Sequence, residues 1–177
     1  MPGELRRTAT AEIKGLVAAS CALLLWTPVV RAQSPPVASR CVAARGAEAI
    51  PPLFAKWIED VWHQGRLELV PQIIGPQYVR HEGDKTRTVT PAEYAEEIDA
   101  TRRVLPDVRF LVHDCAAVGD RLWTRWTMVG TSTQSGQVVR RMAAQVYRIE
   151  DGRLVETWAI MLPGDGTWPE ARGSSTR

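Results

Sequence analysis

The fold is decided by the stretch Val138-Val-Arg-Arg-Met-Ala-Ala-Gln-Val-Tyr147-Arg-Ile-Glu-Asp151-Gly152-Arg-Leu-Val-Glu-Thr-Trp158-Ala-Ile-Met-Leu162. Runs of apolar and β-branched residues, which are typical of strands, lie on both sides of Asp151-Gly152. Asp-Gly between two such runs is a strong hairpin signal, because both residues tolerate a positive φ. We therefore expect two antiparallel strands, 138–149 and 154–162, joined by a tight turn.

The sequence before this hairpin predicts further strands and, earlier still, two helices. Residues 108–117 and 121–130 read as strands separated by a turn at 118–120, and residues 77–81 read as a short strand. Helices followed by an antiparallel run of strands argue for an α+β fold, with the helices packed on one face of a curved sheet.

Both helices carry local start and stop signals. Pro51-Pro52 open the first helix, and Gly65 ends it in the left-handed conformation that glycine adopts easily. Thr90-Pro91-Ala92-Glu93 supplies a capping box with proline at the first helical position, and Pro106 stops this second helix. Apolar residues at three- and four-residue spacing give the first helix one buried face, made of Phe54, Trp57, Ile58, Val61 and Trp62.

Residues 1–32 have the pattern of a secretory signal peptide. Basic residues precede an apolar run of about 11 residues that ends at Trp26, and Val30-Arg31-Ala32 follows as a cleavage site. The run is too short for a bilayer, which takes about 20 residues. We therefore expect export to a periplasm or out of the cell, with no stable membrane span after cleavage; a retained anchor or a wrongly chosen start is the alternative.

Cleavage after Ala32 would leave a mature chain in three parts. Residues 33–49 read as a flexible linker, residues 50–163 as one domain in which order begins near Ile50, and residues 164–177 as a flexible tail. The mature chain keeps 18 basic and 18 acidic residues, so its net charge is zero. Nothing in this balance points to nucleic acid as a partner.

Two cysteines, Cys41 and Cys115, remain in the mature chain. In an oxidising compartment they can pair and tie the N-terminal segment to the sheet. The alternative is a thiol in the linker and a half-buried small hydrophobe in a strand.

Five segments between residues 62 and 158 follow one another in a familiar order. They are Trp62-His-Gln-Gly-Arg-Leu-Glu-Leu, Tyr78-Val-Arg-His81, Leu105-Pro-Asp-Val-Arg-Phe, Gly119-Asp-Arg-Leu-Trp-Thr-Arg125-Trp-Thr-Met-Val-Gly130-Thr and Tyr147-Arg-Ile-Glu-Asp-Gly-Arg-Leu-Val-Glu-Thr-Trp158. Together they resemble the SnoaL-like polyketide cyclase family, within the nuclear transport factor 2-like fold. The resemblance implies a cone-shaped α+β barrel, in which N-terminal helices pack on a strongly curved antiparallel sheet around a deep apolar pocket. It also implies a homodimer through the sheet.

The cyclases of this family use an aspartate on the last strand as acid and base, without a metal, and a histidine on the preceding strand assists. Here the place of the aspartate holds Met161 or Leu162, and the place of the histidine falls near Gln145 or Tyr147. An apolar side chain cannot move a proton, so these departures weaken the transfer of that mechanism.

His81, at a matched histidine position, is the leading catalytic candidate, and Tyr147 is the second. The candidate pocket residues are Trp57, Tyr78, Tyr94, Arg125, Gln145, Trp158 and Met161. In the alternative arrangement Arg125 lies on the outer face of the sheet and His81 is a structural histidine at the rim. His63 lies beside the helix end at Gly65, where a cation suits the helix dipole, and is read as structural.

No spacing of ligands suggests a metal site, and no motif suggests a cofactor. We therefore expect an exported protein whose pocket takes a small hydrophobic or carbonyl compound, with acid–base chemistry of the cyclase or isomerase type. A non-catalytic binder of a small ligand and an oligomeric interaction module are the alternatives. The missing acid on the last strand favours the binder over the cyclase mechanism.

Overall fold

The computed structural model describes residues 41–164, 166 and 168. The elements, in chain order, are β1 (Cys41–Ala43), α2 (Ile50–Lys56), the π-helical turns η1 (Trp57–His63), the short 3₁₀ turn η2 (Leu67–Leu69), α3 (Val70–Ile73), β2 (Ile74–Glu82), β3 (Lys85–Val89), α4 (Pro91–Val104), β4 (Arg109–Val118), β5 (Arg121–Thr131), β6 (Val138–Glu150) and β7 (Arg153–Leu162). The expected signal peptide and residues 33–40 of the expected linker lie outside this range. Within it, no helix has the length and apolar character needed to cross a membrane.

The seven strands form one open, mixed sheet in the order β1-β4-β5-β6-β7-β2-β3. The strands β4 to β7 pair antiparallel, as the sequence predicts. The strands β1 and β2 instead lie parallel to β4 and β7. The expectation of a wholly antiparallel sheet was therefore wrong, because it considered only strands that are neighbours along the chain.

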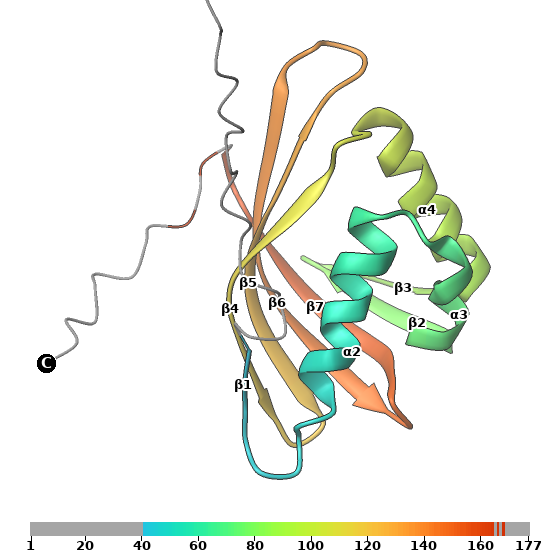
Figure 1. The fold of residues 1–177 in the computed structure, drawn as a ribbon, viewed down its shortest axis with the longest axis vertical. Coiled ribbons are helices and arrows are strands. Elements are labelled where there is room, and N and C mark those ends of the chain that lie inside the picture. The colour runs from blue at the N-terminus through green and yellow to red at the C-terminus, as the bar shows by residue number, and fades with distance from the viewer. Residues whose placement is uncertain (1–40, 165, 167, 169–177) are drawn as a thin grey trace, which may run out of the picture. The chain divides into compact units, whose positions relative to one another are not determined.

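The helices α2, α3 and α4 lie on the same side of the sheet (Figure 1), which confirms the α+β class. We call the sheet face that they cover the inner face and the opposite one the outer face. The first helix runs from α2 into η1 and ends at Gly65, whose φ is 75°. The predicted capping box of α4 is also present, with the Thr90 hydroxyl accepting from the Glu93 amide at 3.3 Å.

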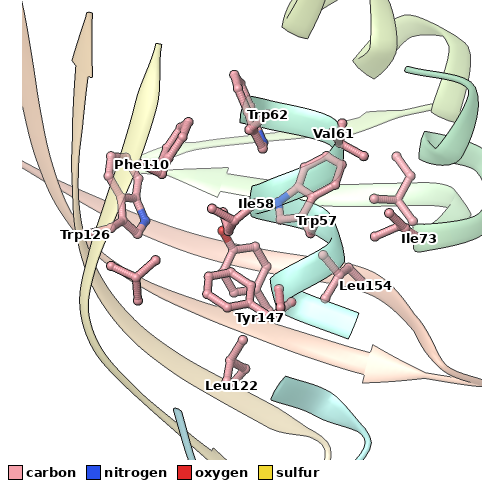
Figure 2. Close-up of a cluster of buried hydrophobic side chains, with 14 of the residues drawn as sticks. Trp57, Ile58, Val61, Trp62, Ile73, Phe110, Leu122, Trp126, Tyr147 and Leu154 are labelled. Carbon is pink, nitrogen blue, oxygen red and sulfur yellow. The ribbon is translucent and has the colours of Figure 1, made fainter. Parts of the chain in front are cut away.

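A hydrophobic core lies between these helices and the inner face (Figure 2). The five apolar residues predicted for the first helix are all buried there. Phe54 packs against Tyr147 of β6, with 5.5 Å between ring centroids. The helix therefore holds its aromatic side chains over the middle of the sheet.

Two strands, β1 and β3, were not predicted from the sequence. The strand β1 lies inside the expected linker, so residues 41–43 are already ordered ahead of the start that was predicted near Ile50. The strand β3 has the polar sequence Lys-Thr-Arg-Thr-Val and forms a hairpin with β2. In the expected tail, Trp168 donates its indole N–H to the backbone carbonyl of Trp126 at 3.0 Å.

Candidate functional site

The register of the sheet places polar and small side chains in rows across the inner face. One row runs over β2, β7, β6 and β5 and consists of Glu82, Ala159, Gln145 and Thr124. The neighbouring row consists of Arg80, Thr157, Tyr147 and Leu122. Ala159 has the smallest side chain of its row, so space remains above it, between Glu82 and Gln145.

A cavity of about 300 Å³ occupies this space, between the inner face and the helices. Its walls are largely aromatic. Trp62 packs on Phe110 with ring centroids 4.8 Å apart, and Phe110 packs edge-on against Trp126 at 5.0 Å. Figure 2 shows Trp57 and Trp62 facing Phe110 and Trp126 across the core. A guest in this space is therefore surrounded mainly by flat apolar surfaces.

Gln145 is the neutral polar side chain at the floor of the cavity. The indole N–H of Trp126, which can only donate, lies 2.9 Å from Gln145 Oε1. Gln145 Nε2 in turn donates to Thr157 Oγ1 at 2.8 Å, and the threonine hydroxyl donates to the Val146 carbonyl at 2.9 Å. These bonds fix the orientation of the amide. A primary amide has two N–H groups, and the bond to Thr157 uses one of them.

The charged part of the cavity lining comes from β2 and α4. Arg80 donates to Glu97 Oε2 at 2.6 Å, also contacts Glu82, and lies 4.4 Å from the centroid of the Tyr94 ring. Arg87 holds the same Glu97 carboxylate, with Nη2 2.8 Å from Oε2. Partial burial alone would raise the pKa of Glu97, but the hydrogen bonds and charges of Arg87 and Arg80 lower it. The Glu97 carboxylate is therefore a fixed anion.

Two tyrosines predicted for the site lie deep in the protein. Burial raises the pKa of Tyr147 far above its ordinary value, so its hydroxyl keeps its proton at the cavity wall. Tyr78 is completely buried behind Tyr94, with stacked rings 5.4 Å apart. Tyr78 supports the wall and does not line the cavity.

The structure brings Trp57, Tyr94, Gln145, Tyr147 and Met161 together around the cavity. Met161 therefore takes the place, beside Ala143, in which the resemblance puts an acid. Its neighbour Leu162 alternates to the outer face.

Three predicted site residues lie on the outer face and not around the cavity, namely His81, Arg125 and Trp158. Arg125 pairs with Asp114, with Nε 3.0 Å from Oδ2. His81 stacks on Trp158 at 5.2 Å with an angle of 11° between the rings, and both residues point away from the helices. A role for His81 inside the cavity is therefore incompatible with this arrangement.

The cavity is also lined by Arg80, Glu82 and Glu97, which were not predicted from the sequence. The signal was present in the alternation of β2, since Tyr78, Arg80 and Glu82 share one face of the strand and His81 belongs to the other. The prediction that His63 lies at the helix end as a cation was also wrong. Its Nε2 accepts the Phe110 N–H at 2.9 Å, which requires the neutral ring.

The cysteine pair lies away from the cavity. Cys41 and Cys115 form a disulfide that holds β1 against β4, with their Cα atoms 4.5 Å apart. Among residues 41–164, 166 and 168, His, Cys, Asp and Glu side chains form no group of three that could hold a metal ion.

Fold and site together define an α+β protein with an aromatic-walled cavity between its helices and an open mixed sheet. The chain belongs to the SnoaL-like polyketide cyclase family, whose model matches residues 53–161. A comparison of the sequence with curated proteins finds no match.

Several solved structures that are similar to this chain have the same fold. A protein of Acidithiobacillus ferrooxidans, described as a candidate polyketide cyclase, is 24% identical and superposes with a TM-score of 0.57 over 67% of this chain and 90% of its own. IdmH from Streptomyces antibioticus, also described as a candidate polyketide cyclase, is 25% identical with a TM-score of 0.53 over 62% and 89%. AclR from Streptomyces galilaeus, described as a candidate hydroxylase, is 23% identical with a TM-score of 0.56 over 66% and 90%.

Proposed function

We propose that this protein binds a small, largely apolar carbonyl compound in the cavity above Ala159. The observation that carries the proposal is the Gln145 amide, which Trp126 and Thr157 hold in one orientation and which keeps an N–H for an acceptor on the guest. The cavity volume of about 300 Å³ is at the lower end of the range of small-molecule sites. Aromatic walls with a few polar anchors are the usual composition of such sites.

Binding can be tested by titrating the tryptophan fluorescence with β-tetralone, a flat apolar ketone, and with tetralin, its hydrocarbon counterpart. Ala159→Leu fills the floor of the cavity and should weaken binding of both compounds by about tenfold or more, which corresponds to about 1.4 kcal/mol. Ala144→Leu adds the same side chain on the outer face of the neighbouring strand and is the matched control. Equal affinities of both variants would contradict the assignment of the cavity.

The carbonyl preference has its own test in Gln145→Leu. The loss of one hydrogen bond should reduce the affinity for β-tetralone by about 1 kcal/mol and leave tetralin binding unchanged. If the wild-type protein binds tetralin as tightly as β-tetralone, the amide does not select a carbonyl.

Acid–base chemistry at the same site is a second candidate, and the position of Glu82 favours it. Glu82 and Gln145 flank Ala159 in one row, so their Cα atoms are two strand spacings apart, about 10 Å. A ketone above Ala159 can direct its oxygen to the Gln145 N–H and an α-hydrogen to the Glu82 carboxylate. The carboxylate would take the α-proton while the C–H electron pair forms the enolate, whose oxygen the amide N–H stabilises.

This chemistry predicts deuterium uptake at the α-carbons of β-tetralone in D₂O, measured by NMR. Glu82→Gln should abolish the uptake above buffer and retain binding. Glu96→Gln, an exposed carboxylate on α4, is the control and should exchange like the wild type. Binding without exchange in the wild type would leave only the binding function.

Export and a homodimer are further parts of the proposal. The Cys41–Cys115 disulfide supports an oxidising compartment, and a mature protein that begins at Gln33 in mass spectrometry of an exported fraction would test it. Exposed apolar side chains on the β4–β5 part of the outer face, such as Val118 and Trp123, support self-association through the sheet. Sedimentation of the wild type and of Trp123→Lys distinguishes a dimer from a monomer.

A further inference from the structure

A chain of hydrogen bonds crosses four strands on the outer face, away from the cavity. Thr86 Oγ1 on β3 lies 2.8 Å from Nδ1 of His81 on β2. His81 Nε2 lies 2.9 Å from Oε1 of Glu156 on β7. Arg148 Nε on β6 donates to the second oxygen of Glu156 at 2.9 Å. A hydroxyl, an imidazole and a carboxylate are thus connected in series.

The chemistry of the groups fixes the protons in this series. The hydrogen bonds from His81 and Arg148 lower the pKa of Glu156, so its carboxylate is ionised and only accepts. In the neutral ring of His81 the hydrogen is therefore on Nε2, and the lone pair is on Nδ1. This lone pair faces the Thr86 hydroxyl, which is the arrangement in which an imidazole removes the proton of a nucleophile.

The geometry of the β2–β3 hairpin leaves the backbone N–H of Thr86 at the free edge of the sheet. Gly83-Asp84 form a two-residue turn closed by Glu82 and Lys85, with φ of Gly83 at 63°. The two residues that close such a turn exchange backbone hydrogen bonds. Pairs alternate along an antiparallel ladder, so the next pair, His81 and Thr86, has no backbone hydrogen bonds between its members. The side chains of such a pair are close together. The strand β3 is at the edge of the sheet. The backbone N–H of Thr86 therefore points to the free edge, beside its own hydroxyl.

An open groove lies next to His81, between the β2–β3 turn and the end of β7. Its volume is about 480 Å³, and its apolar lining includes Trp158 and Ile160 from the outer face and Met161, which also borders the cavity. Trp158 also stacks on the His81 ring, which holds the imidazole in place. The groove can take the apolar part of a substrate whose reactive carbon lies at the hydroxyl.

We propose that Thr86 and His81 form a second, hydrolytic site on the outer face, for esters of short apolar acids, with Glu156 as the residue that positions His81. The Thr86 oxygen attacks the ester carbonyl while His81 Nδ1 takes the hydroxyl proton. The C–O bond to the leaving alcohol breaks, and the alcohol leaves with that proton. A water molecule then attacks the acyl carbonyl while His81 Nδ1 takes its proton. The bond between the acyl carbon and Thr86 Oγ1 breaks, His81 returns the proton to this oxygen, and the acid is released. The Thr86 N–H stabilises the oxyanion of both steps.

The test is the hydrolysis of p-nitrophenyl butyrate by the full chain, followed at the absorbance of p-nitrophenolate. Thr86→Ala and His81→Gln should each lower the rate above buffer by about 100-fold. Thr88→Ala removes a hydroxyl from the same strand and the same face, two residues away, and should hydrolyse the ester like the wild type. Circular dichroism and β-tetralone binding show whether each variant is folded.

The role of Glu156 has a separate readout. Glu156→Gln presents an amide that can donate to Nε2 and so move the ring hydrogen to Nδ1, and it should lower kcat with KM unchanged. Glu156→Asp should restore part of kcat. A purely structural role would change KM and thermal stability instead.

Mass spectrometry of rapidly quenched wild type should find a butyryl group on the peptide that contains Thr86. A wild-type rate no higher than that of Thr86→Ala overturns the proposal. A rate lost only in His81→Gln and kept in Thr86→Ala also overturns it, because the imidazole alone would then be the catalyst.

Discussion

Replacing His63 by glutamine should remove part of the acid sensitivity of this protein. His63 is at the end of η1, and its Nε2 accepts the backbone N–H of Phe110 in β4. Arg109 and Arg102 both donate to the His63 backbone carbonyl, at 3.2 and 3.3 Å. A protonated ring would lose its acceptor and face two guanidinium groups. Burial first, and then the charge of Arg109, lower the pKa of His63 from 6.5 to about 4.

The pKa of His63 sets the size and the sign of the change with pH in the free energy of unfolding. A difference of about 2.5 units between the unfolded and folded states corresponds to about 3 kcal/mol. His63 is only partly buried, and solvent screening reduces this figure to about 2 kcal/mol. The folded pKa lies below the unfolded one, so the unfolded chain binds the proton first. The contribution of neutral His63 to the free energy of unfolding is fully present above pH 6.5 and is lost as the pH falls from 6.5 through about 4.

The assay is urea unfolding of the wild type and of His63→Gln between pH 7.5 and pH 4, with both proteins in the same buffers. Glutamine can offer its side-chain oxygen to the Phe110 N–H but does not titrate. The measurement gives the free energy of unfolding as a function of pH for each protein. Carboxylates contribute equally in both proteins, so the difference between the two curves is due to His63. The wild type should lose about 2 kcal/mol more than the variant over this range. Parallel curves would refute the assignment of a neutral His63.

Three further outcomes concern stability. Loss of the Cys41–Cys115 disulfide, which closes a loop with a sequence separation of 74, should cost about 4 kcal/mol by loop entropy, measured by urea unfolding with and without a reductant; an unchanged midpoint would contradict a disulfide in the folded protein. Thr90→Ala removes the hydroxyl that accepts from the Glu93 amide and should cost about 1 kcal/mol, seen as a lower urea midpoint at an unchanged m-value. Gly130→Ala places a Cβ 3.0 Å from that of Leu105, and this crowding should cost about 1–3 kcal/mol in the same assay.

The helices and the hairpins could be predicted because their signals are local. The Thr90–Glu93 capping box is complete within four residues, and Asp151-Gly152 adopts the two positive φ values, 49° and 69°, that its turn requires. The strand β1 has no such signal. Three residues form a strand there because β4 offers an edge and Cys115 offers a sulfur, with a sequence separation of 74 between Cys41 and Cys115.

In the candidate site, too, the parts with local signals could be predicted from the sequence, and the parts that depend on strand pairing could not. The aromatic face of the first helix follows from its spacing, and it does form the wall of the cavity. The faces of the strands depend on register, which only pairing fixes. A shift of one residue exchanges His81 for Arg80 or Glu82, and the resemblance drew attention to His81. Arg125 and Trp158 were misplaced in the same way, since both alternate to the outer face.

The arrangement of polar groups has a consequence for how any guest must lie. The last strand offers the cavity Ala159 and Met161, and neither side chain can exchange a proton or bind a carbonyl oxygen. The polar groups come instead from both sides of that strand, Gln145 on β6 and the Arg80–Glu82 pair on β2. A guest that satisfies both must lie across β7 and not along it. Its length is then limited by two strand spacings, about 10 Å, which suits a compound of one or two fused rings. A longer polycyclic guest would have to displace the Arg80–Glu97 ion pair toward α4, at the cost of burying these charges without partners.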